Sequence, residues 1–329
     1  MRVAIIGLGR MGSLHAGLLR QMTDVDELFL ADQDLAVART AAATLGGVAL
    51  GDPFAALDAA DAAIIATHPN SHAKLVMAAV ERGRPVMCEK PLAADVAQAT
   101  TLARRVQGSG IPVQVGFHRR FDPGLVAARS LIEEGSLGRL QLIRLEGTEP
   151  GLPPSNLTNI FRNTAVHDFD LVRWLSGEEV TSVFAAGARR EGGTFDPNLD
   201  PDTIVVTLRL ISGALGVVSV SRLSPLGYDV RAEVLGSMDH VSVGWTDRSP
   251  IHAVERLSNT LRPDAWKTWQ ERFEDAYRAE LTAFLAVAAG RRSVPVTMQD
   301  AIEAQRIGEA ARRSMEAGVP IGLDAGRSH

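Results

Sequence analysis

The stretch Val3-Ala-Ile-Ile-Gly-Leu-Gly-Arg-Met-Gly12 decides the fold of this 329-residue chain. Its apolar residues 3–6 predict a buried strand, and the residues that follow Gly12 have the pattern of an amphipathic helix. Between strand and helix, three glycines are spaced as G-x-G-x-x-G, which in this context is typical of a dinucleotide-binding turn. Gly7 would allow the tight turn, Gly9 the close approach of a pyrophosphate, and Gly12 the packing of helix against strand. The helix N-terminus would offer its N–H groups to the phosphates.

A second apolar run, Leu28–Ala31, ends in Asp32, 20 positions after Gly12. A carboxylate at that distance can accept hydrogen bonds from the ribose hydroxyls and would repel a 2′-phosphate. The next residue, Gln33, brings no positive charge. We therefore predict a dinucleotide site that prefers NAD over NADP. The alternative is a glycine-rich turn in some other α/β protein.

Length and composition restrict the class of protein further. A chain of 329 residues predicts two domains, and a net charge of −5 argues against nucleic acid or an anionic membrane as a partner. Cys88 is the only cysteine, which excludes an intrachain disulfide and favours a cytoplasmic location. No apolar stretch is long enough to span a bilayer, so no membrane contact is expected.

The first third of the chain alternates strand and helix. This order predicts right-handed crossovers and a parallel, doubly wound Rossmann sheet in an NAD-binding domain over residues 1–120. Ligands of such sheets bind at the carboxyl ends of the strands. The residues to examine for chemistry are therefore 7–12, 32, 67–72, 89–91 and 117–120.

Beyond residue 120 the pattern changes, because strands now follow one another with short connections. A helix over 166–175 interrupts them, and helices near 273–289 and 298–317 end the chain. This order predicts an α+β domain over residues 121–329 with a large, open, mostly antiparallel sheet. The fold class is thus α/β, with a second domain for substrate binding and oligomerisation.

Two residues are the main candidates for catalysis. Lys90 follows the fifth strand in Glu89-Lys90-Pro91, where a lysine beside the cofactor could polarise a substrate hydroxyl. The alternative is an ordinary loop lysine. His167 lies in an apolar helical run, four residues after Asn163, and could take a proton. The alternative is a core histidine.

Other polar residues near the strand ends are weaker candidates for the functional site. His68 and His72 follow the fourth strand and could contact nicotinamide or ribose, although His72 could equally be structural. Asp168 and Asp170 beside His167 do not have the spacing of a usual zinc site, so no metal is expected.

Several motifs together resemble one family, the Gfo/Idh/MocA oxidoreductases, and within it the inositol 2-dehydrogenase branch. The resemblance covers nearly the whole chain. The motifs are GLGRMG at 7–12, Asp32, Thr67 to His72, Glu89-Lys90-Pro91, GFHRRFDP at 116–123, VHDFDLVRWLSGEE at 166–179 and FEDAYRAEL at 273–281.

The resemblance implies NAD-dependent oxidation of a secondary alcohol on a cyclic polyol or sugar, in a homodimer or homotetramer joined through the C-terminal sheet. Lys90 would bind the reacting hydroxyl and His167 would take its proton. The residues implied to line the cofactor are Gly7, Gly9, Arg10, Met11, Gly12, Asp32, Thr67, His68, His72, Glu89 and Lys90. Those implied to contact substrate are His118, Arg119, Thr164 and Tyr228.

The chain departs from the family pattern at two places. Relatives commonly carry proline directly after the threonine of the fourth strand end, where this chain has His68. Inositol dehydrogenases usually carry an aspartate four residues before the histidine, where this chain has Asn163. An asparagine can hydrogen-bond but brings no negative charge to stabilise an imidazolium. Two other functions therefore stay open: a non-catalytic sugar- or dinucleotide-sensing protein, and an NAD-retaining glycosidase.

Overall fold

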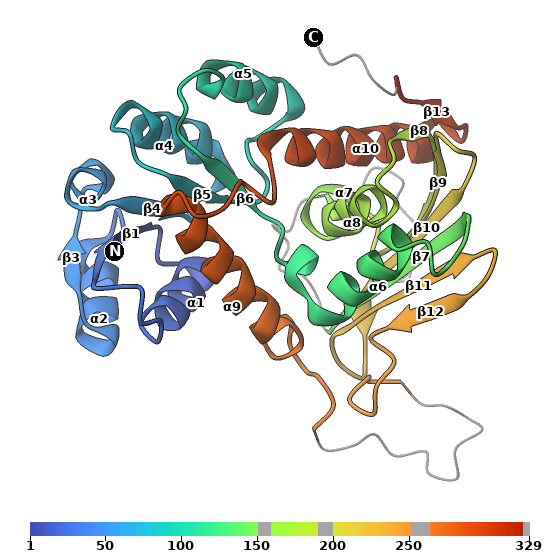
Figure 1. Cartoon of the computed structure of the whole chain (residues 1–329), viewed down its shortest axis with the longest axis horizontal. Coiled ribbons are helices and arrows are strands. Elements are labelled where there is room, and N and C mark those ends of the chain that lie inside the picture. The colour runs from blue at the N-terminus through green and yellow to red at the C-terminus, as the bar shows by residue number, and fades with distance from the viewer. Residues whose placement is uncertain (151–158, 190–199, 252–263, 325–329) are drawn as a thin grey trace. The chain divides into compact units, whose positions relative to one another are not determined.

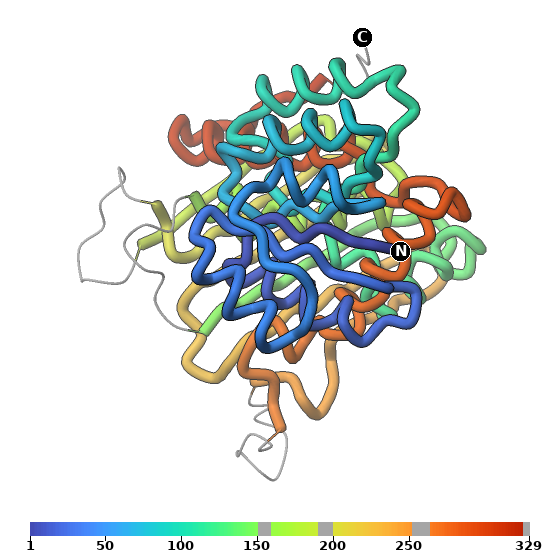
Figure 2. The backbone as a smooth tube through the Cα atoms, turned by 90° about the vertical axis from the view of Figure 1, so that its left-hand side faces the viewer, coloured from blue at the N-terminus to red at the C-terminus, as the bar shows by residue number. Residues whose placement is uncertain are grey.

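The computed structural model describes residues 1–150, 159–189, 200–251 and 264–324 (Figure 1). The chain divides into two compact units. The first unit combines Met1–His118 with Tyr277–Glu303, and the second combines Arg119–Ala276 with Ala304–His329. Nothing in the sequence indicated that residues 277–303 return to the first unit. Figure 2 follows the chain from blue to this returning orange-red segment.

The first unit contains the predicted parallel sheet, in the order β3-β2-β1-β4-β5-β6. Its strands are β1 (Arg2–Ile6), β2 (Glu27–Ala31), β3 (Val48–Leu50), β4 (Ala62–Ile65), β5 (Val86–Glu89) and β6 (Val113–Gly116). The connecting helices are α1 (Arg10–Leu19), α2 (Leu35–Leu45), α3 (Pro53–Ala59), α4 (Pro69–Glu81) and α5 (Val96–Val106). The strand order reverses between β1 and β4, which is where doubly wound sheets bind ligands. In Figure 1, α1 and α2 lie on one side of the sheet and α4 and α5 on the other.

Aspartate is the N-cap residue of most of these helices. Asp34 and Asp52 accept backbone N–H groups of α2 and α3, and Asp95 does so for α5. Such caps pair N–H groups that the first helical turn leaves without intrahelical acceptors. Helix α3 begins within the sequence Gly51-Asp52-Pro53. The same residues supply its cap and an N-terminal proline.

The second unit contains a seven-stranded sheet in the order β12-β11-β7-β10-β9-β8-β13. The strands are β7 (Leu140–Pro150), β8 (Val180–Ala188), β9 (Thr203–Leu210), β10 (Leu215–Ser224), β11 (Asp229–Gly236), β12 (His240–Val243) and β13 (Ile321–Gly322). Among the described strands of this sheet, only β7 and β10 pair in parallel, so the prediction of a mostly antiparallel sheet is confirmed.

Alternate residues of the strands in this second sheet are buried, which shows that one face of the sheet is covered. In β9, Ile204, Val206 and Leu208 are buried while Val205 between them is 46% exposed. Helix α8 (Val166–Ser176) contacts β7 and β10. Its Val172 lies so close to Gly216 that a Cβ at that glycine would come within 3.2 Å of Val172 Cγ1.

The remaining helices complete the two units. Helix α6 (Pro123–Glu133), the short α7 (Ile160–Asn163) and the 3₁₀ turn η1 (His118–Phe121) follow β6 and precede α8. The chain then ends with α9 (Trp269–Ala288) and α10 (Met298–Ala317) before β13. None of the helices in the described ranges is both long and apolar enough to cross a bilayer.

Candidate functional site

The glycine-rich turn between β1 and α1 has the geometry that a dinucleotide needs. Gly7 has φ +89°, a conformation that other residues rarely adopt. A Cβ on Gly12 would come within 1.8 Å of the Gly7 carbonyl oxygen, so only glycine fits there. A Cβ on Gly9 would meet nothing within 4 Å, so the backbone at this position faces open space. Gly9 also begins α1 without any side-chain cap, which leaves the helix N-terminus accessible to a phosphate.

Asp32 lies directly after β2, beside this turn. Its carboxylate accepts the Leu8 N–H at 2.8 Å and the Asp34 N–H at 3.0 Å. The side chain is half-buried, so it is fixed by the backbone yet still reachable by a ribose. Gly9, the α1 N-terminus and Asp32 together fit a dinucleotide. Arg10 is exposed and Met11 half-buried at the start of α1.

The residues after β4 form a connected turn. Thr67 Oγ1 lies 2.7 Å from Ser71 Oγ, and His68 Nδ1 accepts the Asn70 N–H as the cap of α4. His72 is buried, with Nδ1 2.8 Å from the Pro91 carbonyl oxygen and Nε2 2.9 Å from that of Thr67. Burial lowers the pKa of His72, which favours its neutral form. His72 therefore links the residues that follow β4 to those that follow β5, because each of its ring nitrogens lies beside a backbone carbonyl oxygen of one of these segments.

Glu89 and Lys90 lie at the carboxyl end of β5. Glu89 Oε1 is 2.7 Å from His15 Nε2 of α1, and Glu89 Oε2 accepts the Lys90 N–H at 3.2 Å. The Lys90–Pro91 bond is cis, and the Lys90 side chain is half-buried. His118, after β6, stacks on Tyr277 of α9 with ring centroids 4.2 Å apart. Lys90 and His118 thus belong to the first unit, like every proposed cofactor residue.

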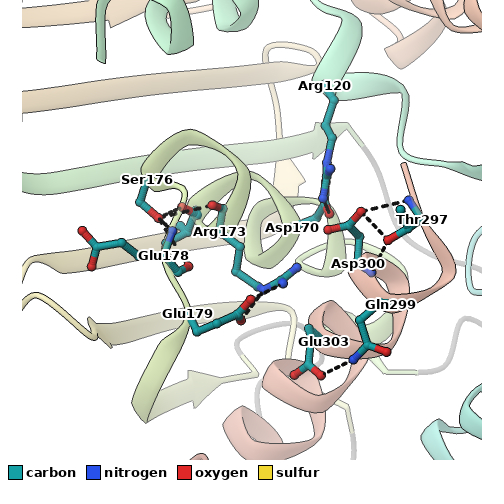
Figure 3. Close-up of polar contacts among 11 residues, drawn as sticks. Arg120, Asp170, Arg173, Ser176, Glu178, Glu179, Thr297, Gln299, Asp300 and Glu303 are labelled. Carbon is teal, nitrogen blue, oxygen red and sulfur yellow. Dashed lines mark hydrogen bonds and ion pairs between the residues drawn. The ribbon is translucent and has the colours of Figure 1, made fainter. Parts of the chain in front are cut away.

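The second unit contributes a different cluster, centred on α8. His167, Asp168 and Asp170 of this helix are all buried. Arg119 Nη1 donates to Asp168 at 2.7 Å, and Arg120 donates to both carboxylate oxygens of Asp170, at 2.8 and 2.5 Å (Figure 3 for the latter pair).

Tyr228 lies at the start of β11 and joins this cluster through Arg119, whose Nη2 donates to its hydroxyl at 3.4 Å. Burial raises the pKa of Asp168, and the guanidinium of Arg119 opposes that rise. Asp168 and Asp170 therefore act as partners of arginines. Within the described residues, no three His, Cys, Asp or Glu side chains gather where a metal ion could bind.

Asn163 and His167 are on separate helices. Asn163 ends α7, Thr164 and Ala165 connect, and α8 begins at Val166. The Ile160 carbonyl accepts the N–H groups of both Thr164 and Ala165, so the chain bends tightly there. Asp200 in turn accepts the Ile160 N–H and pairs with Arg222. The four-residue spacing would place Asn163 and His167 on one face only if the helix of His167 began before Asn163, and α8 begins at Val166. Both residues remain candidates for the site.

Sequence reasoning missed His15 and Glu280. His15 lies in the helix that follows the glycine turn, and its position there did not mark it as a candidate. Glu280 belongs to the FEDAYRAEL motif at 273–281. Both side chains are fully buried in the first unit. A charged residue that interrupts the apolar face of a helix was the available signal, because such residues are seldom buried without a reason.

Comparisons with known proteins agree on one family. A family model described as "Oxidoreductase family, NAD-binding Rossmann fold", of the Gfo/Idh/MocA group, matches residues 1–117, and the model of the Gfo/Idh/MocA C-terminal domain matches residues 125–241.

Individual relatives extend the match to nearly the full chain. The chain is 37% identical to the myo-inositol dehydrogenase Hyg17 of Streptomyces leeuwenhoekii, over 98% of this chain and 99% of that protein. It is 31% identical to the scyllo-inositol 2-dehydrogenase (NAD(+)) of Bacillus subtilis, over 100% and 98%. Among solved structures, a probable dehydrogenase from Thermotoga maritima superposes with a TM-score of 0.90 at 30% identity, over 98% of this chain and 99% of that chain.

Proposed function

Because the chain belongs to the Gfo/Idh/MocA family of NAD-dependent oxidoreductases, we propose that it oxidises a secondary alcohol on a cyclic polyol of the inositol type, or on a related sugar. The observation that carries this proposal is the full-length similarity to two dehydrogenases named for inositols, at 37% and 31% identity. The resemblance read from the sequence motifs pointed to the same branch.

Lys90 and His167 supply the chemistry in this proposal. Lys90 follows the strand end that a Rossmann sheet presents to its ligand, and its ammonium group binds the substrate oxygen and stabilises developing negative charge. His167 accepts the hydroxyl proton. His118, Arg119, Thr164 and Tyr228 contact the remaining hydroxyls, and Asn163 contributes an uncharged amide to the same site.

NAD accepts the hydride when it is bound. The open backbone at Gly9 and the uncapped N-terminus of α1 support placing the pyrophosphate there, and the fixed carboxylate of Asp32 supports placing the adenosine ribose beside it. Arg10, Met11, Thr67, His68, His72 and Glu89 complete the proposed lining.

A homodimer or homotetramer through the second sheet is part of the proposal. The face of that sheet opposite α8 carries exposed apolar residues, with Phe184 40%, Val205 46% and Leu215 43% exposed. Apolar side chains exposed on one face of a sheet support a subunit interface there. We also place the protein in the cytoplasm, on the strength of its single, buried thiol. Light scattering would test the assembly, and Val205→Lys should weaken it.

The decisive experiment is a screen for NAD reduction over a panel of inositols, aldoses and their derivatives. We expect one group of cyclic polyols to give turnover with NAD and much less with NADP. Cleavage of a glycoside with no net NAD reduction would instead favour an NAD-retaining glycosidase. Tight binding of NAD and polyol with no turnover at all would favour a sensing protein.

A further inference from the structure

Helix α1 carries a buried histidine that the proposed reaction does not use. His15 lies in the helix that begins at the glycine-rich turn, and its side chain is completely buried in the first unit. Its Nε2 atom lies 2.7 Å from Oε1 of Glu89, the last residue of β5. This hydrogen bond ties the helix of the glycine-rich turn to the strand that leads to Lys90.

The same hydrogen bond fixes which ring nitrogen of His15 carries the proton. A carboxylate can only accept, so Nε2 has to be the donor. Nδ1 of the same ring is buried and has no hydrogen-bond partner among the described residues. A proton on Nδ1 would therefore be a buried donor without an acceptor, which is costly. The neutral ring with its proton on Nε2 is the form that suits these surroundings.

Glu89 has a second contact, and that contact reaches Lys90. Its Oε2 atom accepts the Lys90 backbone N–H at 3.2 Å. Gly116 on the adjacent strand leaves this oxygen little space, because a Cβ there would come within 3.1 Å of it. Since the carboxylate group is planar, any rotation that moves one oxygen also moves the other. Holding Oε1 at His15 therefore holds Oε2 where it can accept the Lys90 N–H.

His15 also makes a packing contact, which offers a competing reason for a ring at this position. The ring meets Tyr277 edge-on with centroids 6.0 Å apart, and Tyr277 stacks on His118 at 4.2 Å. Any flat ring of similar size could make the edge contact, whereas only a side chain with a hydrogen-bond donor can hold Glu89. The donor and the ring can therefore be tested separately.

We propose that His15 is a positioning residue that donates from Nε2 to Glu89 and thereby orients the carboxylate that holds the Lys90 backbone at the carboxyl end of β5. His15 is completely buried, and it acts on the reaction only through Glu89. Its effect on the Lys90 backbone follows from these contacts, and only its effect on the rate rests on the proposed function.

Two substitutions separate the donor from the ring. His15→Gln keeps an N–H donor without the ring, and His15→Phe keeps a flat ring without the donor. His240→Phe, at an exposed position of β12, is the control for the same change of residue type.

Labelling with [¹⁵N]lysine gives a direct NMR view of the Lys90 amide, because the chain has only three lysines, Lys74, Lys90 and Lys267. The Lys90 signal is the one that disappears in Lys90→Met. We expect it to shift in the Phe variant and to stay in place in the Gln variant and in the control, while the other two signals are unchanged. A Lys90 signal that stays in place in the Phe variant, or that moves as far in the Gln variant, would overturn the proposal.

Histidine-selective ¹⁵N NMR tests the hydrogen bond in the unaltered protein, so this test does not depend on how well the Phe variant folds. The His15 ring signals are those that disappear in His15→Gln. We expect a protonated Nε2 and an unprotonated Nδ1. The opposite tautomer would mean that His15 does not donate to Glu89, which also overturns the proposal.

Kinetics then test the effect on the reaction. The Phe variant should lower kcat for polyol oxidation about tenfold or more, and the Gln variant should keep it within about threefold, with NAD affinity near normal in both. In a Glu89→Ala background, adding His15→Phe should cause no further loss, because the residue through which His15 acts is already gone. A further loss as large as in the natural background would show that His15 acts by another route. If no form oxidises any polyol while both NMR results are as expected, the proposed function fails and the placement of the Lys90 backbone by His15 stands.

Discussion

Arg120 donates two hydrogen bonds to Asp170, at 2.8 and 2.5 Å, and the two side chains are 7% and 1% exposed. The pair ties the segment after β6 to α8, the helix that carries His167 (Figure 3). A buried pair of this kind contributes little net stability, but the loss of one partner leaves an uncompensated buried charge.

Asp170→Asn should therefore lower the free energy of unfolding by about 3–5 kcal/mol. The double substitution Arg120→Met with Asp170→Leu should recover much of that loss, because neither charge remains. Denaturant unfolding measures both effects. Glu316→Gln is the control, since its partnership with Arg312 is exposed, and it should change stability by less than about 1 kcal/mol. A similar small change for Asp170→Asn would contradict the importance of this pair.

Gly12→Ala should destabilise the first unit and weaken NAD binding, because its Cβ would lie 1.8 Å from the Gly7 carbonyl oxygen. Overpacking of this kind costs about 1–3 kcal/mol. Gly17→Ala in the same helix is the matched control. Nothing lies within 4 Å of its added Cβ, so the protein should gain about 0.5–1 kcal/mol of stability from the better helix former. Unfolding curves and NAD titration of both variants distinguish the two sites, and a harmless Gly12→Ala would be inconsistent with the described turn.

Asp32→Asn should raise the affinity for NADP relative to NAD by on the order of tenfold, equivalent to about 1.4 kcal/mol, because the charge that repels a 2′-phosphate is gone. Asparagine has the shape of aspartate, and its side-chain oxygen can still accept the hydrogen bond from the Leu8 N–H. Asp34→Asn removes a charge two residues further on, from a carboxylate that caps α2, and should leave the preference unchanged. Calorimetric titration with NAD and NADP measures the ratio of the two affinities in each variant. Equal shifts in the two variants would show that the effect is only long-range charge.

Lys90→Met should reduce kcat/KM by about a hundredfold or more while NAD affinity stays near normal, because the interaction is made mainly with the developing charge in the transition state. Lys74→Met, at an exposed position of α4, is the control for the loss of one lysine and should have no effect. If both variants retain the full rate, Lys90 is a structural residue of its turn.

Asn163→Asp should change which polyols are oxidised, because a carboxylate would replace an uncharged amide at the end of α7. Asn163→Ala serves as the comparison that removes the side-chain group without adding charge. Rates across the polyol panel for both variants measure the effect. Activity that appears only in the Asp form would show that the natural protein has lost the reaction and would favour the sensing function.

The sequence by itself determined the type of sheet in each unit. Alternating strand and helix signals before residue 120 predicted the parallel sheet, because apolar periodicity and helix caps are local features that short segments express on their own. The strand-rich pattern afterwards predicted the second, mostly antiparallel sheet. The roles predicted for Gly7, Gly9 and Gly12 followed from their spacing between a strand and a helix, since a turn of this kind is also a local feature.

Only the tertiary structure decided which distant residues meet. The return of 277–303 to the first unit, which stacks Tyr277 on His118, depends on packing between segments more than 150 positions apart. The pairing of Arg119 with Asp168 and of Arg120 with Asp170 likewise spans 49 and 50 positions. Side chains so far apart in sequence leave no periodic signal, because burial and electrostatics select their partners only after the chain has folded.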